Sequence, residues 1–183
     1  MNDYKWLNES RITFEGDKIG IYATGQSDFF NSKCNAPYYY TEVEGNFVMK
    51  VKVSHDFTDT YDSSSIMVMK DLQTWAKACF ELTDFGTHAV VSVVTKNDSD
   101  DANGCNISGN EVWLQITRVD RTFAFHYSTD GVHFYMMRVF RLPVEDSVKV
   151  GLLAQAPVGN GGNRYYEHLT IERKTVRNIR KGE

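Results

Sequence analysis

Hydrophobic and polar residues alternate with a period of two along most of the chain, and helical spacing is nearly absent. Residues 47–54 alternate in this way over a full strand length, which is typical of a strand with one buried face. Residues 89–94 form a short β-branched apolar run, which indicates a strand covered on both faces. Alternation predicts further strands at 75–82, 114–116, 123–127, 134–140, 148–154 and 165–171.

Turn residues separate these segments. Asp130-Gly131 is a dipeptide typical of tight hairpins, and it lies between residues 123–128 and 133–140. Similar breaks occur at Glu44-Gly45-Asn46, Glu15-Gly16-Asp17 and Val119-Asp120-Arg121. About ten or more short strands with almost no helix predict an all-β fold, a large antiparallel sandwich or jelly roll.

The length of 183 residues suits a single domain, so residues 1–183 are expected to share one core. Hydrophobic residues make up 42% of the chain, which supplies enough apolar surface for a packed interior and argues against disorder. No internal repeat or composition break suggests a second domain.

Charge and cysteine content exclude several classes of protein. The net charge of −4 argues against a general nucleic-acid binder, which needs a basic surface. No apolar run approaches the ~20 residues of a membrane helix, and Met1–Trp6 has no basic segment that leads into an apolar one, as a secretory leader would. The three scattered cysteines, Cys34, Cys79 and Cys105, suit reduced thiols, so a cytoplasmic location is expected.

Residues 75–82 carry the most informative chemistry. Strand periodicity places Trp75, Lys77, Cys79 and Glu81 on one face. An aromatic ring beside charged groups suits a sugar-binding groove, because the ring stacks on a pyranose and the charged groups bond its hydroxyls. The alternative is structural: Lys77 and Glu81 pair with other strands and Trp75 covers them.

A second strand repeats this arrangement, since Trp113, Gln115 and Thr117 share one face of it. On its other face, Arg118 either lies at the strand end or enters a paired site. Tyr127 comes from a flanking hairpin strand, and Gln155 continues the alternation of 148–154 so that its amide could reach the same concave face. Each of these residues also has an ordinary interpretation as a sheet residue.

No metal or cofactor is predicted. The histidines and cysteines lack the spacing of zinc ligands. Asp56, Asp59 and Asp62 could hold Ca²⁺ in an acidic loop, as could residues 98–101, but a solvated loop is the favoured interpretation of both segments. The sequence therefore predicts no cofactor.

Catalytic residues are not evident. A glycosidase would need two carboxylates about 5–10 Å apart across a groove, and the Glu-x-Asp-x-x-Glu run of laminarinase-type sandwiches is absent. Glu81 has no acidic residue two positions away. The last stretch, residues 172–183, carries a charge of +3 from five basic and two acidic residues. It is expected to be a final strand and a solvated tail, and the alternative is a tail that contacts nucleic acid or an acidic partner.

Several segments resemble family 1349 of the domains of unknown function, which is similar to the yeast regulation-of-enolase protein and to the accessory β-sandwich of family 43 glycosidases. The segments that carry the resemblance span nearly the whole chain: Trp6–Glu9, Trp75–Glu81, Val91–Thr95, Ser99-Asp100, Trp113–Ile116, Tyr127–Gly131 and Val150–Pro157. The resemblance implies a concanavalin A-like jelly roll of two curved antiparallel sheets. It also implies that a groove, if present, would involve Trp75, Lys77 and Glu81, with Trp113 and Tyr127 as further aromatic residues.

Three functions remain in competition. The favoured one is a non-catalytic protein that binds a small sugar or sugar derivative through Trp75, Lys77 and Glu81. The alternatives are a glycoside-acting enzyme with Glu81 as acid or base, and a regulatory or assembly module that pairs through its edge strands. All three depend on where the face of residues 75–81 lies in the folded molecule.

Overall fold

The protein is described here by a computed structural model that covers residues 3–183. Met1 and Asn2 lie outside the described residues; they are the first two of the six residues from which no secretory leader was expected. Two seven-stranded antiparallel sheets form the molecule. Sheet I contains, in spatial order, β1 (Lys5–Leu7), β6 (Tyr38–Glu44), β15 (Ser147–Gln155), β8 (Ser63–Asp71), β9 (Thr74–Leu82), β10 (His88–Lys96) and β11 (Asp98–Asn106).

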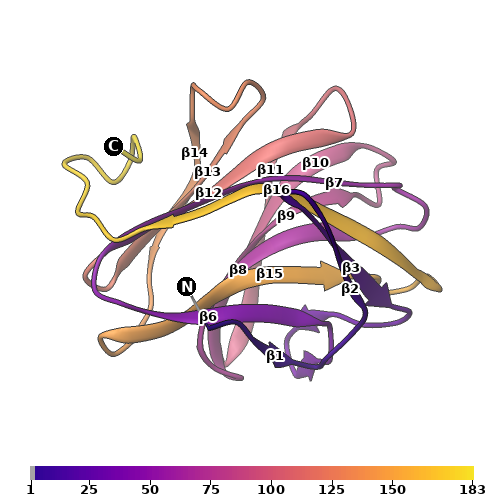
Figure 1. Ribbon diagram of the computed structural model, residues 1–183, viewed down its shortest axis with the longest axis horizontal. Coiled ribbons are helices and arrows are strands. Elements are labelled where there is room, and N and C mark those ends of the chain that lie inside the picture. The colour runs from indigo at the N-terminus through magenta and orange to yellow at the C-terminus, as the bar shows by residue number, and fades with distance from the viewer. Residues whose placement is uncertain (1–2) are drawn as a thin grey trace.

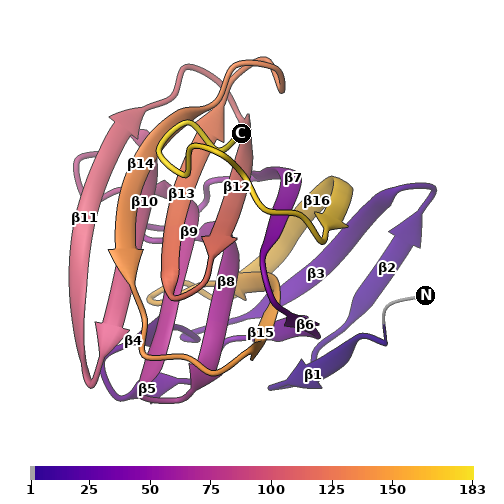
Figure 2. The ribbon, with the colours of Figure 1, turned by 90° about the vertical axis from the view of Figure 1, so that its left-hand side faces the viewer.

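Sheet II lies against sheet I as a second layer, as the two perpendicular views show (Figure 1, Figure 2). Its strands, in spatial order, are β14 (Tyr135–Arg141), β13 (Thr122–Ser128), β12 (Glu111–Val119), β7 (Phe47–His55), β16 (Gly161–Glu172), β3 (Lys18–Thr24) and β2 (Ile12–Glu15). A small hairpin of β4 (Phe29–Phe30) and β5 (Lys33–Cys34) is not paired with a strand of either sheet. The predicted all-β sandwich of two antiparallel sheets is therefore confirmed.

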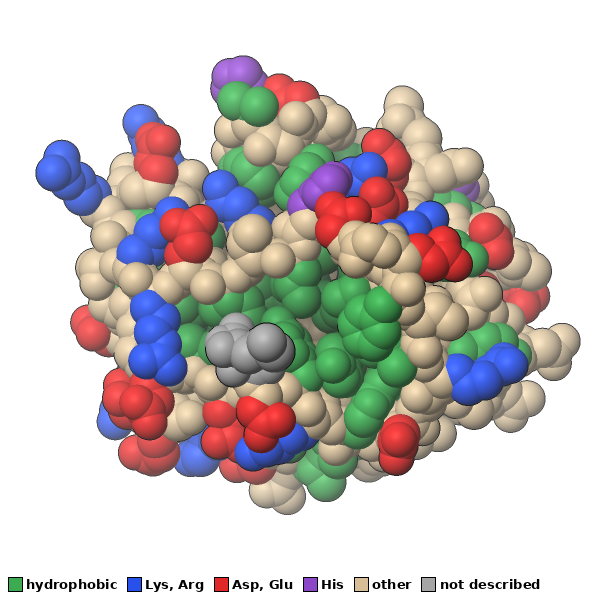
Figure 3. Space-filling model, in the orientation of Figure 1, with side chains coloured by type: hydrophobic (Ala, Val, Ile, Leu, Met, Phe, Trp, Pro, Cys, Tyr) green, Lys and Arg blue, Asp and Glu red, His purple; other side chains and the backbone are tan. Residues whose placement is uncertain are grey.

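The main hydrophobic core lies between the two sheets. Alternate residues of each strand enter it, such as Val51 of β7, Leu114 of β12 and Phe80 of β9. At the side where β1 and β6 face β2 and β3, partly buried apolar residues such as Trp6 and Tyr39 border the core, and Figure 3 shows hydrophobic side chains in a hollow on this side of the molecule. No helix of residues 3–183 has the length and apolarity that a membrane span requires.

Two segments differ from their predicted structure. Residues 98–101 were expected to form a loop, but they belong to β11, an edge strand that pairs with β10 from Ala89 to Lys96. The exposed acidic residues hide this strand from pattern reasoning because backbone pairing, and not burial, holds it in place. The strand β8 begins with Ser63-Ser64-Ser65 and is buried on both faces, so it shows no alternation either.

The tail after the last strand has mostly exposed side chains, as expected, but its backbone also packs against sheet II. Residues 173–183 fold back over the outer face of sheet II, where the carbonyl of Arg180 lies 3.2 Å from Nε2 of His126. Nε2 of Gln115 donates to the carbonyl of Gly182 at 3.4 Å. This C-terminal segment buries His126 and Gln115, both less than 2% exposed, because their polar groups find backbone partners in it.

The outer face of sheet I is covered over only part of its area. Residues around the β4–β5 hairpin pack onto it and create a second hydrophobic cluster, which includes Phe29, Tyr38, Met67 and Trp75. The side chain of Asn8 secures this region by donating to the carbonyls of Cys34 and Ala36, both at 3.0 Å. Beside the hairpin, the strands β9, β10 and β11 stay partly uncovered.

Candidate functional site

A cavity of about 430 Å³ lies on the outer face of sheet I, beside the β4–β5 hairpin. Its floor comes from alternate residues of β9, β10 and β11, and its walls come from the hairpin and from three loops. The lining residues are Asp28, Phe30, Tyr61, Lys77, Glu81, Asp84, Phe85, Val91, Val93, Asp101, Asn103 and Pro157. Lys77 and Glu81, two residues predicted to form a binding site, are among them.

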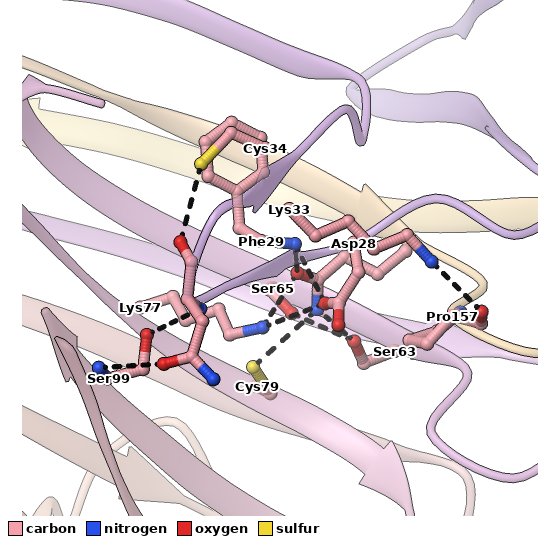
Figure 4. Close-up of polar contacts among 12 residues, drawn as sticks. Asp28, Phe29, Lys33, Cys34, Ser63, Ser65, Lys77, Cys79, Ser99 and Pro157 are labelled. Carbon is pink, nitrogen blue, oxygen red and sulfur yellow. Dashed lines mark hydrogen bonds and ion pairs between the residues drawn. The ribbon is translucent and has the colours of Figure 1, made fainter. Parts of the chain in front are cut away.

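Lys77 is held firmly at one end of the cavity. Its Nζ lies 3.2 Å from Oδ1 of Asp28 and donates to Oε1 of Gln155 at 2.8 Å (Figure 4). Burial lowers the pKa of the Lys77 ammonium, but nearby negative charges, including Asp28 and Glu81, outweigh that effect and raise it. Lys77 is therefore a charged residue whose partners are already supplied.

Gln155 connects Lys77 to a buried polar network. Its side chain is 1% exposed, accepts from the backbone N–H of Phe29 at 3.2 Å and donates to Oγ of Ser63 at 2.7 Å. The prediction that Gln155 lies on the same face as Lys77 agrees with this contact. Because its amide is fully engaged, Gln155 positions Lys77 and Asp28 and does not itself line the cavity.

Glu81 is an unpaired group of the site. Within residues 3–183, its carboxyl group makes no hydrogen bond and no ion pair. Burial raises the pKa of this carboxyl group to about 8. The carboxylates of Asp101, Asp28 and Asp84 raise it as well, and the ammonium of Lys77 opposes them. At neutral pH, Glu81 is therefore largely protonated and can donate a hydrogen bond into the cavity.

Trp75 is not in contact with the cavity, so the expectation of an open stacking surface at this residue is wrong. Its side chain is 0% exposed and meets the ring of Phe29 edge-on, with centroids 5.6 Å apart. Its Nε1 donates to the carbonyl of Leu72 at 3.3 Å. Cys79 is buried on the same face, and burial raises the pKa of its thiol to about 12. The hairpin covers this half of the face, which the alternation of residues 75–81 does not reveal.

The aromatic rings at the cavity come from elsewhere. Phe30, Tyr61 and Phe85 line it and remain 36%, 38% and 76% exposed. Phe30 belongs to β4, Tyr61 lies between β7 and β8, and Phe85 lies in the turn between β9 and β10. Sequence reasoning missed them because they lie in the two-residue strand β4 or in turns, outside the long alternating strands. Their signal was the presence of large apolar side chains within polar turn segments, where burial cannot explain them.

The other predicted aromatic residues lie away from the cavity. Trp113 projects from the outer face of sheet II, where His168 stacks on it with ring centroids 5.5 Å apart. Tyr127 shares a strand face with Phe123 and Phe125 and packs against the main core. Trp113 is therefore separated from the cavity by both sheets, and Tyr127 is separated from it by sheet I.

Arg118 has a structural position. It lies near the end of β12, is 3% exposed and donates to three backbone carbonyls, those of Asp120, Glu145 and Asp146. Of the two options that the sequence left open, the paired site is the one observed, but its partners are loop carbonyls and not a ligand. Arg118 holds the 145–146 loop against the end of the sheet.

No calcium loop is formed by residues 56–62. Asp62 is buried and lies 2.9 Å from the guanidinium of Arg164, and its second oxygen accepts from the backbone N–H of Asp59. Its charge is thereby balanced without a metal ion. Among the described residues, no group of three or more His, Cys, Asp or Glu is arranged to hold a metal ion.

These features define a class: an all-β sandwich of two antiparallel sheets with a cavity on an outer sheet face. The model of the family described as "Protein of unknown function (DUF1349)" matches residues 6–174, so the chain belongs to that family. A search of curated protein sequences found no match to the chain.

Solved structures show the same fold. A functionally unknown protein from Saccharomyces cerevisiae is similar with a TM-score of 0.87 at 24% identity, over 94% of this chain and 97% of that one. The carbohydrate-binding module CBM66 from Bacillus subtilis gives a TM-score of 0.63 at 9% identity, over 94% and 96% of the two chains.

Part of a longer enzyme is also similar. The GH43 protein BlXynB from Bacillus licheniformis gives a TM-score of 0.71 at 13% identity, over 86% of this chain but only 33% of the enzyme. The chain thus spans about a third of that enzyme's length. At these identities the likeness concerns the fold alone.

Proposed function

We propose that the protein binds a small carbohydrate in the cavity beside the β4–β5 hairpin. The single observation that carries this proposal is the composition of the cavity: exposed aromatic rings at its walls and unpaired polar groups on its floor. Phe30, Tyr61 and Phe85 supply the rings, and Glu81 and Asp101 supply the polar groups. The fold shared with a carbohydrate-binding module supports the proposal without naming a ligand.

The chemistry of a sugar matches this composition. One face of a pyranose is apolar and packs against a flat ring, while its hydroxyl groups need both donors and acceptors. Protonated Glu81 can donate, and the amide of Asn103 can donate or accept. The volume of about 430 Å³ lies within the range of small-molecule sites, which is roughly 300–1,000 Å³.

A glycan array followed by calorimetric titration tests the proposal. Phe85→Ala is expected to weaken binding of any captured sugar by about tenfold, since each stacked ring contributes on the order of 1 kcal/mol. Phe14→Ala, which removes a 60% exposed ring from β2 in sheet II, is the matched control and is expected to change nothing. If no sugar binds, or if both variants behave alike, the proposal fails.

Glycoside hydrolysis is a second candidate, favoured by the raised pKa of Glu81 in a cavity that also contains ionisable Asp28, Asp84 and Asp101. A neutral carboxyl group can protonate a leaving oxygen while a second carboxylate activates water or attacks the sugar. Chromogenic glycosides at pH 6–7 test it. Turnover that disappears in Glu81→Gln supports this candidate, and turnover that survives the change excludes Glu81 as the acid.

A further inference from the structure

The cavity contains far more negative than positive groups. Four carboxyl groups line it, those of Asp28, Glu81, Asp84 and Asp101, whereas Lys77 is its one cationic lining residue, so the formal charge of the lining is −3 with all four ionised and −2 while Glu81 is protonated. The Lys77 ammonium is occupied by Asp28 and Gln155. The carboxyl groups of Glu81 and Asp101 therefore have no cation of their own among residues 3–183.

The aromatic residues point to the same kind of ligand independently. Phe30, Tyr61 and Phe85 all line the cavity and are all exposed. The faces of aromatic rings carry negative electrostatic potential and attract ammonium groups, and rings combined with carboxylates are the usual setting for such groups. The hydroxyl groups of a neutral sugar can donate to carboxylates, but they cannot neutralise an excess of negative charge.

We infer that the cavity prefers a sugar bearing a positive charge, a protonated amino sugar, over a neutral sugar of the same size. This inference rests on the proposed function and specifies its ligand class. The ammonium group lies between Glu81 and Asp101, and the pyranose ring packs against the aromatic walls. The affinity gained comes from the attraction between the ammonium group and the ionised carboxylates of the cavity, which a neutral hydroxyl group does not provide.

Calorimetric titration with glucosamine, glucose and N-acetylglucosamine at pH 6.5 is the direct test. Glucosamine is expected to bind at least about tenfold more tightly than the two neutral sugars, and the preference is expected to shrink at high salt. Equal affinity for glucose and glucosamine overturns this inference and leaves the proposed function standing. Failure of every sugar to bind overturns the proposed function and the inference together.

Single-residue variants localise the effect. Asp101→Asn is expected to reduce the preference for glucosamine at pH 6.5 about threefold or more, whereas Glu81→Gln, which replaces a largely protonated carboxyl group at this pH, is expected to change it little. Asp100→Asn removes the neighbouring carboxylate of β11, which alternation directs away from the cavity, and is expected to leave the preference unchanged. If the preference falls equally in Asp100→Asn and Asp101→Asn, the binding site is not the cavity, and the preference results only from the net negative charge of the protein.

A ligand with a permanent charge reveals the part played by Glu81. Affinity for trimethylated glucosamine is expected to rise between pH 6 and 9, as Glu81 ionises, and to stay flat in Glu81→Gln. The charged groups that face Glu81 are Lys77 on its own strand, Asp101 on β11, Asp28 beside the hairpin and Asp84 in the adjacent turn. A pH dependence that persists in Glu81→Gln assigns it to one of these groups and overturns the role of Glu81.

Discussion

Residues on the same face of one strand have different surroundings in this protein. Trp75, Lys77, Cys79 and Glu81 all project from the outer face of sheet I, as their spacing predicts. The hairpin buries Trp75 and holds Lys77 through Asp28. Cys79 is buried beside Ala89 and Val91, and Glu81 is left open to the cavity. The spacing of residues 75–81 predicted which face they share, but it contained no information about a covering segment more than 40 residues earlier in the chain.

The raised pKa of Glu81 is expected to make the free energy of unfolding depend on pH. Its pKa is about 8 in the folded protein and about 4.5 when unperturbed, so the folded state binds the extra proton between these values. Stability therefore falls as pH rises from about 4.5 to about 8. Glu81→Gln removes this fall and is expected to be more stable than the parent above pH 8 by on the order of 1–3 kcal/mol. Urea denaturation at several pH values measures it, and identical pH profiles for the two proteins would contradict the assignment.

Trp75 is expected to contribute to stability and not directly to ligand binding. Trp75→Ala leaves a large void beneath Phe29 and is expected to cost about 3–5 kcal/mol of unfolding free energy. Trp113→Ala is the control, because that ring is only partly buried on sheet II. Chemical denaturation compares the two, and a small effect of Trp75→Ala would show that the hairpin does not depend on this ring.

At the scale of elements, both sheets are partly covered by irregular segments. The β4–β5 hairpin covers sheet I, and the C-terminal segment covers sheet II, where it supplies backbone partners to Gln115 and His126. Burial lowers the pKa of His126. Its neutral form is therefore favoured in the folded state, and the stability it contributes is lost as pH falls below about 6.5.

Gly182 is expected to be the point on which the C-terminal segment depends. A Cβ at Gly182 would lie 2.2 Å from Nε2 of Gln115, whereas a Cβ at Gly45 would meet nothing within 4 Å. Both residues have positive φ, 75° and 70°, so the backbone strain of alanine is matched at about 1–2 kcal/mol. Gly182→Ala is expected to cost more than Gly45→Ala by about 1 kcal/mol and to raise the pKa of His126 towards 6.5, measured by NMR titration. An unchanged His126 titration would show that the segment does not shield this residue.

At the scale of the whole molecule, the sandwich was predictable and the site was only half so. The alternating segments became β7, β9, β13 and the hairpin partner β14, and they sufficed for the fold. The strands β8 and β11 escaped detection because one is buried on both faces and the other on neither. Burial patterns encode which face of a strand is inward, but not which sheet the strand joins or which loop covers it. That is why Trp113 and Tyr127 were placed beside Trp75 although the fold separates them.

The acidic edge of sheet I is expected to keep the protein monomeric. β11 is an edge strand with exposed carboxylates at Asp98 and Asp100, and like charges discourage edge-to-edge pairing. Arg138 of β14 donates to the carbonyl of Asp100 at 3.1 Å and links this edge to sheet II.

The variant with Asp98→Val and Asp100→Val is expected to self-associate at concentrations where the parent remains monomeric, as measured by light scattering. Glu9→Val with Asp56→Val removes the same charge from two loops and is the control. Association of both double variants would attribute the effect to net charge and not to the edge strand.

The hairpin that walls the cavity is joined to sheet I by the ion pair of Asp28 with Lys77 and by hydrogen bonds from the backbone N–H groups of Phe29 to Gln155 and of Asn31 to Ser99. A charged molecule that binds beside this pair is expected to change the strength of the ion pair. The opening of the hairpin, and with it the hydrogen-exchange rate of the backbone amides of Phe29 to Cys34, is then expected to change as well. The exchange of these few amide hydrogens with heavy water thereby becomes a label-free gauge of whether any small molecule has been captured, even one whose identity is still unknown.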